Sequence, residues 1–335
     1  MEQHFSMAAM HWLADHRLSW LTPLMQAASF LGEVQGYVVV GTLIYVTFDK
    51  SLAVRLMLLV TLTMCLNHVL KILIKNPRPF ILEGDHLQKW SVPQSYARDL
   101  AIEYSTPSGH AMAGAAFYSY LFGSVRNWLV RMLAVVAVLL TGASRPYLGV
   151  HFVEDILLGW AIGSCVGVLA LSHGRRLGAW WNKLSYARRI TFAVTASAAF
   201  WVITVAMNGW EIDSQPRAFL GYAGTITGII IAQPLELQMV DFDPRSSSIA
   251  VKVLRYLLTV ALSLFALESL GSLFTTTADN YSVVGYALQY ARYVIVSIVS
   301  LFLAPWLFTR IGLAKTATGQ AHRRSLDENG QQACS

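Results

Sequence analysis

The sequence predicts an all-α fold, a polytopic membrane helix bundle of about nine transmembrane helices in which a six-helix core is followed by C-terminal helices. Of its 335 residues, 55% are hydrophobic and only 13% are charged. Soluble domains carry about 25% charged residues. Mean hydropathy is +0.48, and several apolar runs exceed the roughly 18 residues that cross a bilayer.

Nine apolar stretches have the length and composition of spans. We expect them at 31–48, 52–75, 108–124, 127–143, 151–172, 190–208, 217–236, 251–275 and 285–309. In the preceding segment, 1–30, the spacing of Met10, Leu13, Leu21 and Met25 favours an amphipathic helix at the membrane surface, which Pro23 interrupts. The alternative is a first span that simply begins earlier.

The basic residues indicate an orientation. One set of alternate connections, with the C-terminal tail, holds 16 Lys and Arg, and the opposite set holds 8. The positive-inside rule places the richer side in the cytoplasm, with the N-terminus outside. This distribution also accounts for the net charge of +6 without a nucleic-acid partner.

The side with fewer Lys and Arg residues concentrates its polar residues in two connections. The first begins in "KILIKNPRPF", which starts at Lys71. His68, Lys71 and Lys75 have the spacing of one helix face. The two prolines predict a helix end near Asn76. Basic residues at a helix end are often only anchors that reach the interface. Arg78 adds a further cation.

The same connection ends in "STPSGHAMAG". Ser108 is a favoured N-cap, and free amides at a helix N-terminus bind anions. Gly109 allows close backbone approach, and His110 follows beside the anion site. The simpler alternative is a helix start with a surface histidine.

The second connection reads "SRPYLGVHFVED". Arg145 can bind an oxyanion through two nitrogens, and Gly149 provides a turn. His151 and Asp155 are four residues apart, so we expect them to face each other on one helix surface. A carboxylate on one imidazole nitrogen leaves the other as a nucleophile. The alternative is a pair that only caps a helix.

Together these segments place three cations, a helix N-terminus and two histidines on one membrane face, which suits phosphoryl transfer. Their motifs resemble those of the type 2 phosphatidic acid phosphatase superfamily, which shares its site with vanadium haloperoxidases. The motifs are Lys71 with Arg78-Pro79, Pro107-Ser108-Gly109-His110, and Ser144-Arg145 with His151 and Asp155. The resemblance covers about residues 20–175.

The resemblance implies roles for these residues. His151 would attack phosphorus and become a phosphohistidine, Asp155 would orient it, and His110 would protonate the leaving oxygen. The residues that would bind the phosphoryl group are Lys71, Arg78, Ser108, Gly109 and Arg145. No metal or other cofactor is expected, because the cations already neutralise the phosphate.

Several functions fit such a site. We expect a hydrolase for a lipid phosphate or pyrophosphate on the periplasmic face of a bacterial inner membrane. A sugar-phosphate phosphatase resembling glucose-6-phosphatase, a lipid phosphotransferase and an anion transporter are the alternatives. The expected parts are the phosphatase core 31–175, C-terminal helices 176–310 and a disordered cytoplasmic tail 311–335; oligomeric state is not indicated.

Two ionisable residues in the last two spans lie at similar depth. Glu268 and Arg292 are each placed about 9–11 Å from the outer end of their span at 1.5 Å per residue. Buried ionisable groups usually pair or face a polar cavity. We expect either a structural ion pair between them or an Arg292 that lines a polar entrance.

Overall fold

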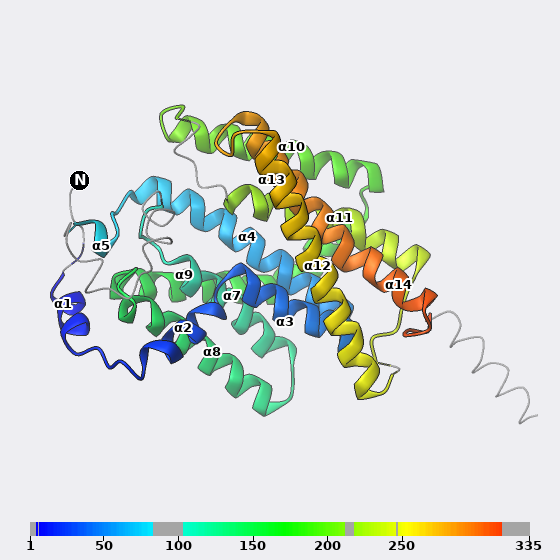
Figure 1. Ribbon diagram of the computed structural model, residues 1–335, viewed down its shortest axis with the longest axis horizontal. Coiled ribbons are helices and arrows are strands. Elements are labelled where there is room, and N and C mark those ends of the chain that lie inside the picture. Colours follow the sequence, from blue (N-terminus) through cyan, green and yellow to red (C-terminus); the bar gives the residue numbers. More distant parts are fainter. Residues whose placement is uncertain (1–4, 6, 83–102, 212–217, 246, 317–335) are drawn as a thin grey trace, which may run out of the picture.

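The computed structural model describes residues 5, 7–82, 103–211, 218–245 and 247–316, and within these ranges the chain is a helical bundle (Figure 1). The described residues form no β-sheet; their one bridge joins Phe242 to Thr316. The predicted all-α membrane fold is therefore confirmed. The tail expected to be disordered lies, from residue 317 onward, outside the described residues.

Each of the nine expected spans coincides with a helical stretch. These are α3 (Val34–Thr47), α4 (Lys50–Ile74), α7 (Gly109–Ser124), α8 (Trp128–Tyr147), α9 (Val153–Asn182), α10 (Tyr186–Met207), α11 (Ala218–Met239), α12 (Ile249–Thr277), and α13 (Val283–Ile298) continued by η1 (Val299–Leu303) and α14 (Ala304–Arg310). By length and composition, six described helices qualify as membrane spans: α4, α8, α9, α10, α12 and the α13–α14 stretch. The number nine stays a prediction.

Small residues bring α7 and α9 into close contact, which matters because each helix begins at the candidate site. Gly159, Gly163 and Gly167 are one turn apart and all face α7. A Cβ atom at Gly163 would lie 2.1 Å from the carbonyl oxygen of Met112, so no larger side chain fits without separating the helices. Such stripes of small residues are a common basis for membrane helix packing.

The C-terminal helices α10–α14 gather on one side of α4 (Figure 1). Within this group, glycines of α11 again allow close packing, because a Cβ atom at Gly224 would lie 2.4 Å from the carbonyl oxygen of Tyr290 on α13. The group also touches the core near the site: the ring of His68 on α4 stacks on Phe219 of α11 at 4.6 Å between centroids. The C-terminal helices therefore pack directly against the helix that carries Lys71.

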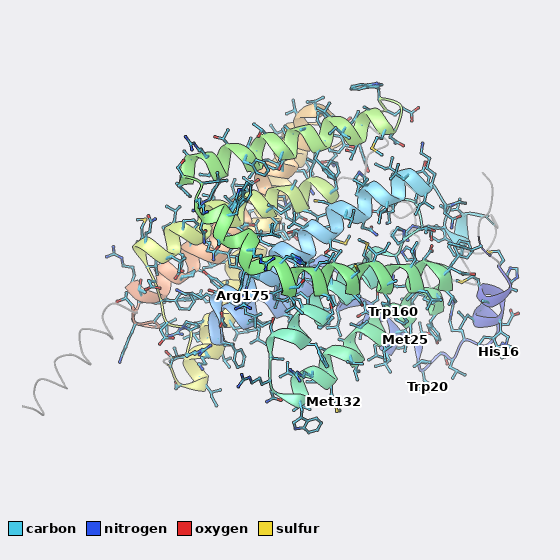
Figure 2. The ribbon with its side chains drawn as sticks, turned by 180° about the vertical axis from the view of Figure 1, so that it is seen from behind. His16, Trp20, Met25, Met132, Trp160 and Arg175 are labelled. Carbon is cyan, nitrogen blue, oxygen red and sulfur yellow. The ribbon has the colours of Figure 1, made fainter. Side chains whose placement is uncertain are left out.

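The N-terminal segment folds as two short helices, α1 (Ala8–Asp15) and α2 (Thr22–Phe30). The break lies at residues 16–21, so the prediction that Pro23 interrupts the helix is wrong. Pro23 is the second residue of α2, where its missing N–H costs nothing. Met10 and Met25 are buried in an apolar cluster with Tyr147 and Phe152. Figure 2 shows His16 and Trp20 of this segment at the end of the molecule where α9 begins, with Arg175 toward the other end of α9.

The expected ion pair between Glu268 and Arg292 does not form. Arg292 Nε instead donates to the backbone carbonyl of Leu267 on α12 at 2.8 Å, and Glu268 makes no ion pair with any described residue. The reason is Gly271: its missing side chain lets the guanidinium lie against the α12 backbone, where a Cβ would be 2.4 Å from Nη2. Arg292 thus joins α12 to α13 through a carbonyl.

Candidate active site

The end of α4 presents one buried lysine to the site. Lys71 is 6% exposed, and the helix ends three residues later at Ile74, in agreement with the predicted stop. Lys75 adopts a left-handed conformation (φ 53°) and is exposed. The expectation that His68, Lys71 and Lys75 share one face is therefore wrong for Lys75, because the backbone leaves the helix before it.

Arg78 follows α4, just ahead of the single turn α5 (Pro79–Leu82), and is almost fully buried. Its Nη1 atom donates to the backbone carbonyl of Val150 at 3.1 Å and lies 3.1 Å from Nε2 of His151. Its Nε atom donates to the backbone carbonyl of Glu103 at 3.0 Å. One guanidinium therefore ties the end of α4 to the third motif and to Glu103, in the loop ahead of the second motif.

Ser108 is the N-cap residue of α7, as predicted, but its hydroxyl does not cap the helix. Its backbone N–H donates to the carbonyl of Asp155 at 3.2 Å. The Oγ atom is buried and makes no hydrogen bond to any described residue. Nε2 of His110 is likewise buried without a partner in the described chain. Buried polar atoms are normally bonded, so these two are suited to a polar ligand.

Gly109 permits a close approach between α7 and α4. A Cβ atom there would lie 3.1 Å from Oδ1 of Asn67 and 3.1 Å from Cε of Met64. Asn67 also holds the loop before α7, since its Nδ2 donates to the carbonyl of Pro107 at 3.0 Å. The second motif is thus fixed directly against α4.

His151 lies two residues ahead of α9, following a turn at Gly149 whose φ of 80° favours glycine. His151 and Asp155 therefore do not face each other along one helix surface, as their spacing predicted. They meet because Asp155 turns back at the start of α9. Its Oδ2 accepts from the Phe152 amide at 2.9 Å and lies 3.3 Å from Nδ1 of His151.

The contacts of His151 define which nitrogen carries its proton. Arg78 has only donors, so Nε2 must be the acceptor in that contact and Nδ1 carries the proton toward Asp155. Burial, followed by the charges of Arg78, Arg145 and Lys71, holds the pKa of His151 well below its ordinary value. His151 is therefore neutral near pH 7, with its lone pair directed at the cations.

Asp155 receives two further hydrogen bonds that the sequence motifs did not predict. Ser105 Oγ and Thr106 Oγ1 donate short hydrogen bonds to its two carboxylate oxygens. Asn76 supports Thr106, because its Nδ2 donates to Oγ1 at 2.9 Å. The sequence offered one signal for these contacts: Ser105 and Thr106 directly precede "PSGH", so their hydroxyl groups lie beside the second motif.

Arg145 lies in the last turn of α8 and is held by the N-terminal segment. Its Nη1 atom donates a short hydrogen bond to Oγ of Ser29 on α2. Close by, a Cβ atom at Gly32 would lie 2.4 Å from Thr141 and 3.0 Å from the His110 ring. Residues from well outside the three motifs therefore form part of the site, and no local pattern indicated this.

Glu103 was also missed, although it makes the shortest ion pair among the described residues of the site. Its Oε2 lies 2.6 Å from Nζ of Lys71 and 3.4 Å from Nη2 of Arg78. Burial raises the pKa of Glu103, but Lys71 and Arg78 outweigh this and lower it to about 2. The carboxylate is therefore ionised at neutral pH and already bound to two predicted phosphate ligands.

The family model described as the PAP2 superfamily matches residues 52–178, the range that holds all three motifs. A second, described as a PAP2 superfamily phosphatase transmembrane extension, matches residues 220–316. Phosphatidylglycerophosphatase B of Bacillus subtilis is 32% identical over 161 residues, which are 44% of this chain and 72% of the relative. The chain belongs to the PAP2 superfamily. The predicted resemblance is confirmed, and the protein is a membrane-embedded phosphatase of that family.

Other relatives match about half of the chain. The undecaprenyl-diphosphatase of Sulfolobus acidocaldarius is 24% identical over 157 residues, or 47% of this chain and 72% of its own. Among solved structures, a transmembrane PAP2-type phosphatidylglycerolphosphate phosphatase from Bacillus subtilis is 27% identical with a TM-score of 0.41, covering 50% of this chain and 84% of that one. LpxE of Aquifex aeolicus is 22% identical with a TM-score of 0.43, covering 51% and 98%.

Proposed function

We propose that this PAP2 phosphatase hydrolyses a lipid phosphate or pyrophosphate at the periplasmic face of a bacterial inner membrane through a phosphohistidine. The observation that carries the proposal is the state of His151: Nδ1 is bound toward Asp155, and the lone pair of Nε2 is directed at Arg78. A ligand site for an anion needs no oriented imidazole, whereas nucleophilic catalysis does.

In the proposed reaction, Nε2 of His151 attacks phosphorus as the bond to the leaving oxygen breaks. His110 gives its proton to that oxygen, and then accepts one from the water that hydrolyses the phosphohistidine. Lys71, Arg78 and Arg145 neutralise the phosphoryl oxygens, and the hydroxyl of Ser108 and the amide of Gly109 bind them further. Asp155 stabilises the positive charge that develops on His151.

The lipid substrate is supported by two relatives, a phosphatidylglycerophosphatase and an undecaprenyl-diphosphatase, whose names describe lipid phosphate substrates. A substrate with its tail in the bilayer can reach a site built at the ends of membrane helices. The periplasmic placement rests on charge: α9 begins at the site and carries Arg175 and Arg176 in its other half, as the positive-inside rule requires of a cytoplasmic end.

The test is phosphate release by purified protein from a panel of lipid phosphates, a lipid pyrophosphate and sugar phosphates. The proposal predicts that lipid substrates are hydrolysed and that sugar phosphates neither turn over nor compete. A sugar phosphate that displaces the lipid would favour a soluble substrate. Transfer of phosphate to an added alcohol in preference to water would favour a phosphotransferase. His151→Ala protein serves as the blank for contaminating phosphatases.

A further inference from the structure

Glu103 places a carboxylate on two of the cations that are proposed to hold the substrate phosphate. Oε2 accepts from Nζ of Lys71 at 2.6 Å and pairs with Nη2 of Arg78 at 3.4 Å. The backbone carbonyl of the same residue accepts from Nε of Arg78 at 3.0 Å. Glu103 belongs to none of the three motifs, and the mechanism above gives it no task.

The burial of the three side chains differs in a way that bears on this contact. The side chains of Lys71 and Arg78 are 8% and 2% exposed, whereas that of Glu103 is 28% exposed. Buried cations are costly without a partner, and Glu103 supplies one. Because Glu103 reaches them from the more open side, its carboxylate can leave while both cations stay in place.

We propose that Glu103 is a resident competing anion, which exchanges with phosphate on Lys71 and Arg78 and so weakens the hold of the site on the inorganic phosphate product. The inference rests on the phosphate-binding part of the proposed function. A phosphate dianion and the ionised carboxylate repel each other when both contact the same cations. Whenever phosphate binds, Glu103 must give up its two ion pairs or remain close to a like charge.

Such competition discriminates between product and substrate. A lipid phosphate is held by its apolar tail as well as by its phosphate, whereas inorganic phosphate has only the cations. The electrostatic penalty is the same for both ligands, but the tail supplies the lipid with binding energy that inorganic phosphate lacks, so the product is the ligand left weakly bound. After the phosphohistidine is hydrolysed, return of Glu103 to Lys71 and Arg78 displaces the phosphate.

A purely structural role for Glu103 predicts the opposite sign. If the carboxylate serves only to hold Lys71 and Arg78 in position, its removal disorders them and phosphate binds more weakly. Glu103→Gln separates the two roles, because glutamine keeps the size and one acceptor of glutamate but removes the charge. Glu154→Gln is the matched control: Glu154 is half-buried on the first turn of α9 and forms no ion pair with any described residue.

The experiment is calorimetric titration of the full-length proteins in detergent with inorganic phosphate and, separately, orthovanadate. We expect Glu103→Gln to lower the Kd of both anions at least tenfold, the equivalent of about 1.4 kcal/mol. Glu154→Gln should leave both unchanged. An unchanged or raised Kd in Glu103→Gln overturns the proposal. If that variant does not fold, Glu103→Asp retains the charge on a shorter chain and must still lower the Kd, by a smaller factor.

The binding assay does not depend on turnover, so it separates the two proposals. A protein that binds phosphate more tightly as Glu103→Gln, yet releases none from any lipid, supports the competing anion and contradicts the proposed function. If the protein hydrolyses lipid phosphates but Glu103→Gln leaves its phosphate affinity unchanged, the result supports the proposed function and contradicts the competing anion. In the active enzyme, product inhibition by phosphate should strengthen in Glu103→Gln by the same factor as binding.

Discussion

Nε2 of His151 lies 3.1 Å from Nη1 of Arg78. A nucleophile that waits in contact with a guanidinium has its lone pair fixed and its protonation opposed by the positive charge. The same guanidinium also contacts Val150 and Glu103, so its position does not depend on His151. When phosphate enters, Arg78 can transfer its hydrogen bond to a phosphoryl oxygen and leave Nε2 facing phosphorus.

The first prediction concerns His110. Because Nε2 of His110 is buried without a partner in the described chain, we expect it to act on the leaving oxygen. His110→Ala should reduce kcat about 10²-fold or more for substrates with poor leaving groups, and far less for an aryl phosphate. Steady-state rates across a series of leaving groups measure this. Equal losses across the series would rule out general acid catalysis by His110.

The second prediction is a pH profile. Protonation of His151 removes its lone pair, and burial together with the nearby cations lowers its pKa. As pH falls, the free enzyme should therefore keep its activity until well below 6.5, the ordinary value for histidine. The acid limb of kcat/KM should be measured with two substrates of different phosphate pKa, because the limb that stays fixed belongs to the enzyme. A fixed limb above pH 6.5 would contradict a neutral His151.

The third prediction tests the contact between α7 and α9, which carry His110 and Asp155. Gly163→Leu places a side chain where even a Cβ meets the Met112 carbonyl at 2.1 Å. We expect about 1–3 kcal/mol of destabilisation and a loss of kcat in any protein that folds, because the two motifs separate. Gly174→Leu is the control on the same helix, since a Cβ there meets nothing within 4 Å. Thermal unfolding and phosphate release are compared for both variants. Equal effects of Gly163→Leu and Gly174→Leu would contradict the prediction.

The fourth prediction concerns metals and vanadate. Three cationic side chains are proposed to neutralise the phosphate, so activity should persist in EDTA. Vanadate should inhibit at concentrations well below KM, because it mimics five-coordinate phosphorus and transition-state mimics bind more tightly than substrates. Loss of activity in EDTA that magnesium restores would show that the cations alone are insufficient.

The sequence was sufficient for the helices, because apolar length and residue spacing are local properties. The convergence of the three motifs was predicted from their placement on one membrane face and from the family resemblance. The sequence was insufficient where contacts join distant segments. Ser29 meets Arg145 across 116 residues, and Glu103 meets Lys71 across 32. The predicted ion pair between Glu268 and Arg292 was wrong for a related reason: the space at Gly271 lets Arg292 reach the backbone carbonyl of Leu267 on α12. The alternative, in which Arg292 lines a polar entrance, stays a prediction.

The local geometry of His151 and Asp155 shows the same limit on a smaller scale. Four-residue spacing indicated that the two side chains meet, and they do, at 3.3 Å. They do not meet along one helix face, as the spacing suggested. His151 precedes α9, and the Asp155 side chain turns back toward the N-terminus of that helix. Ser105 and Thr106, which complete the shell around Asp155, come from a loop whose path no periodic pattern describes.

The most direct test of the account is to trap the intermediate. Purified protein is mixed with a lipid substrate labelled in its phosphate, quenched in alkali to preserve phosphohistidine, and analysed by peptide mapping. We expect label on His151 and no label in His151→Ala, whose folded state is checked by its thermal unfolding. Turnover by a folded His151→Ala protein at near wild-type rate, or label on another residue, would contradict it.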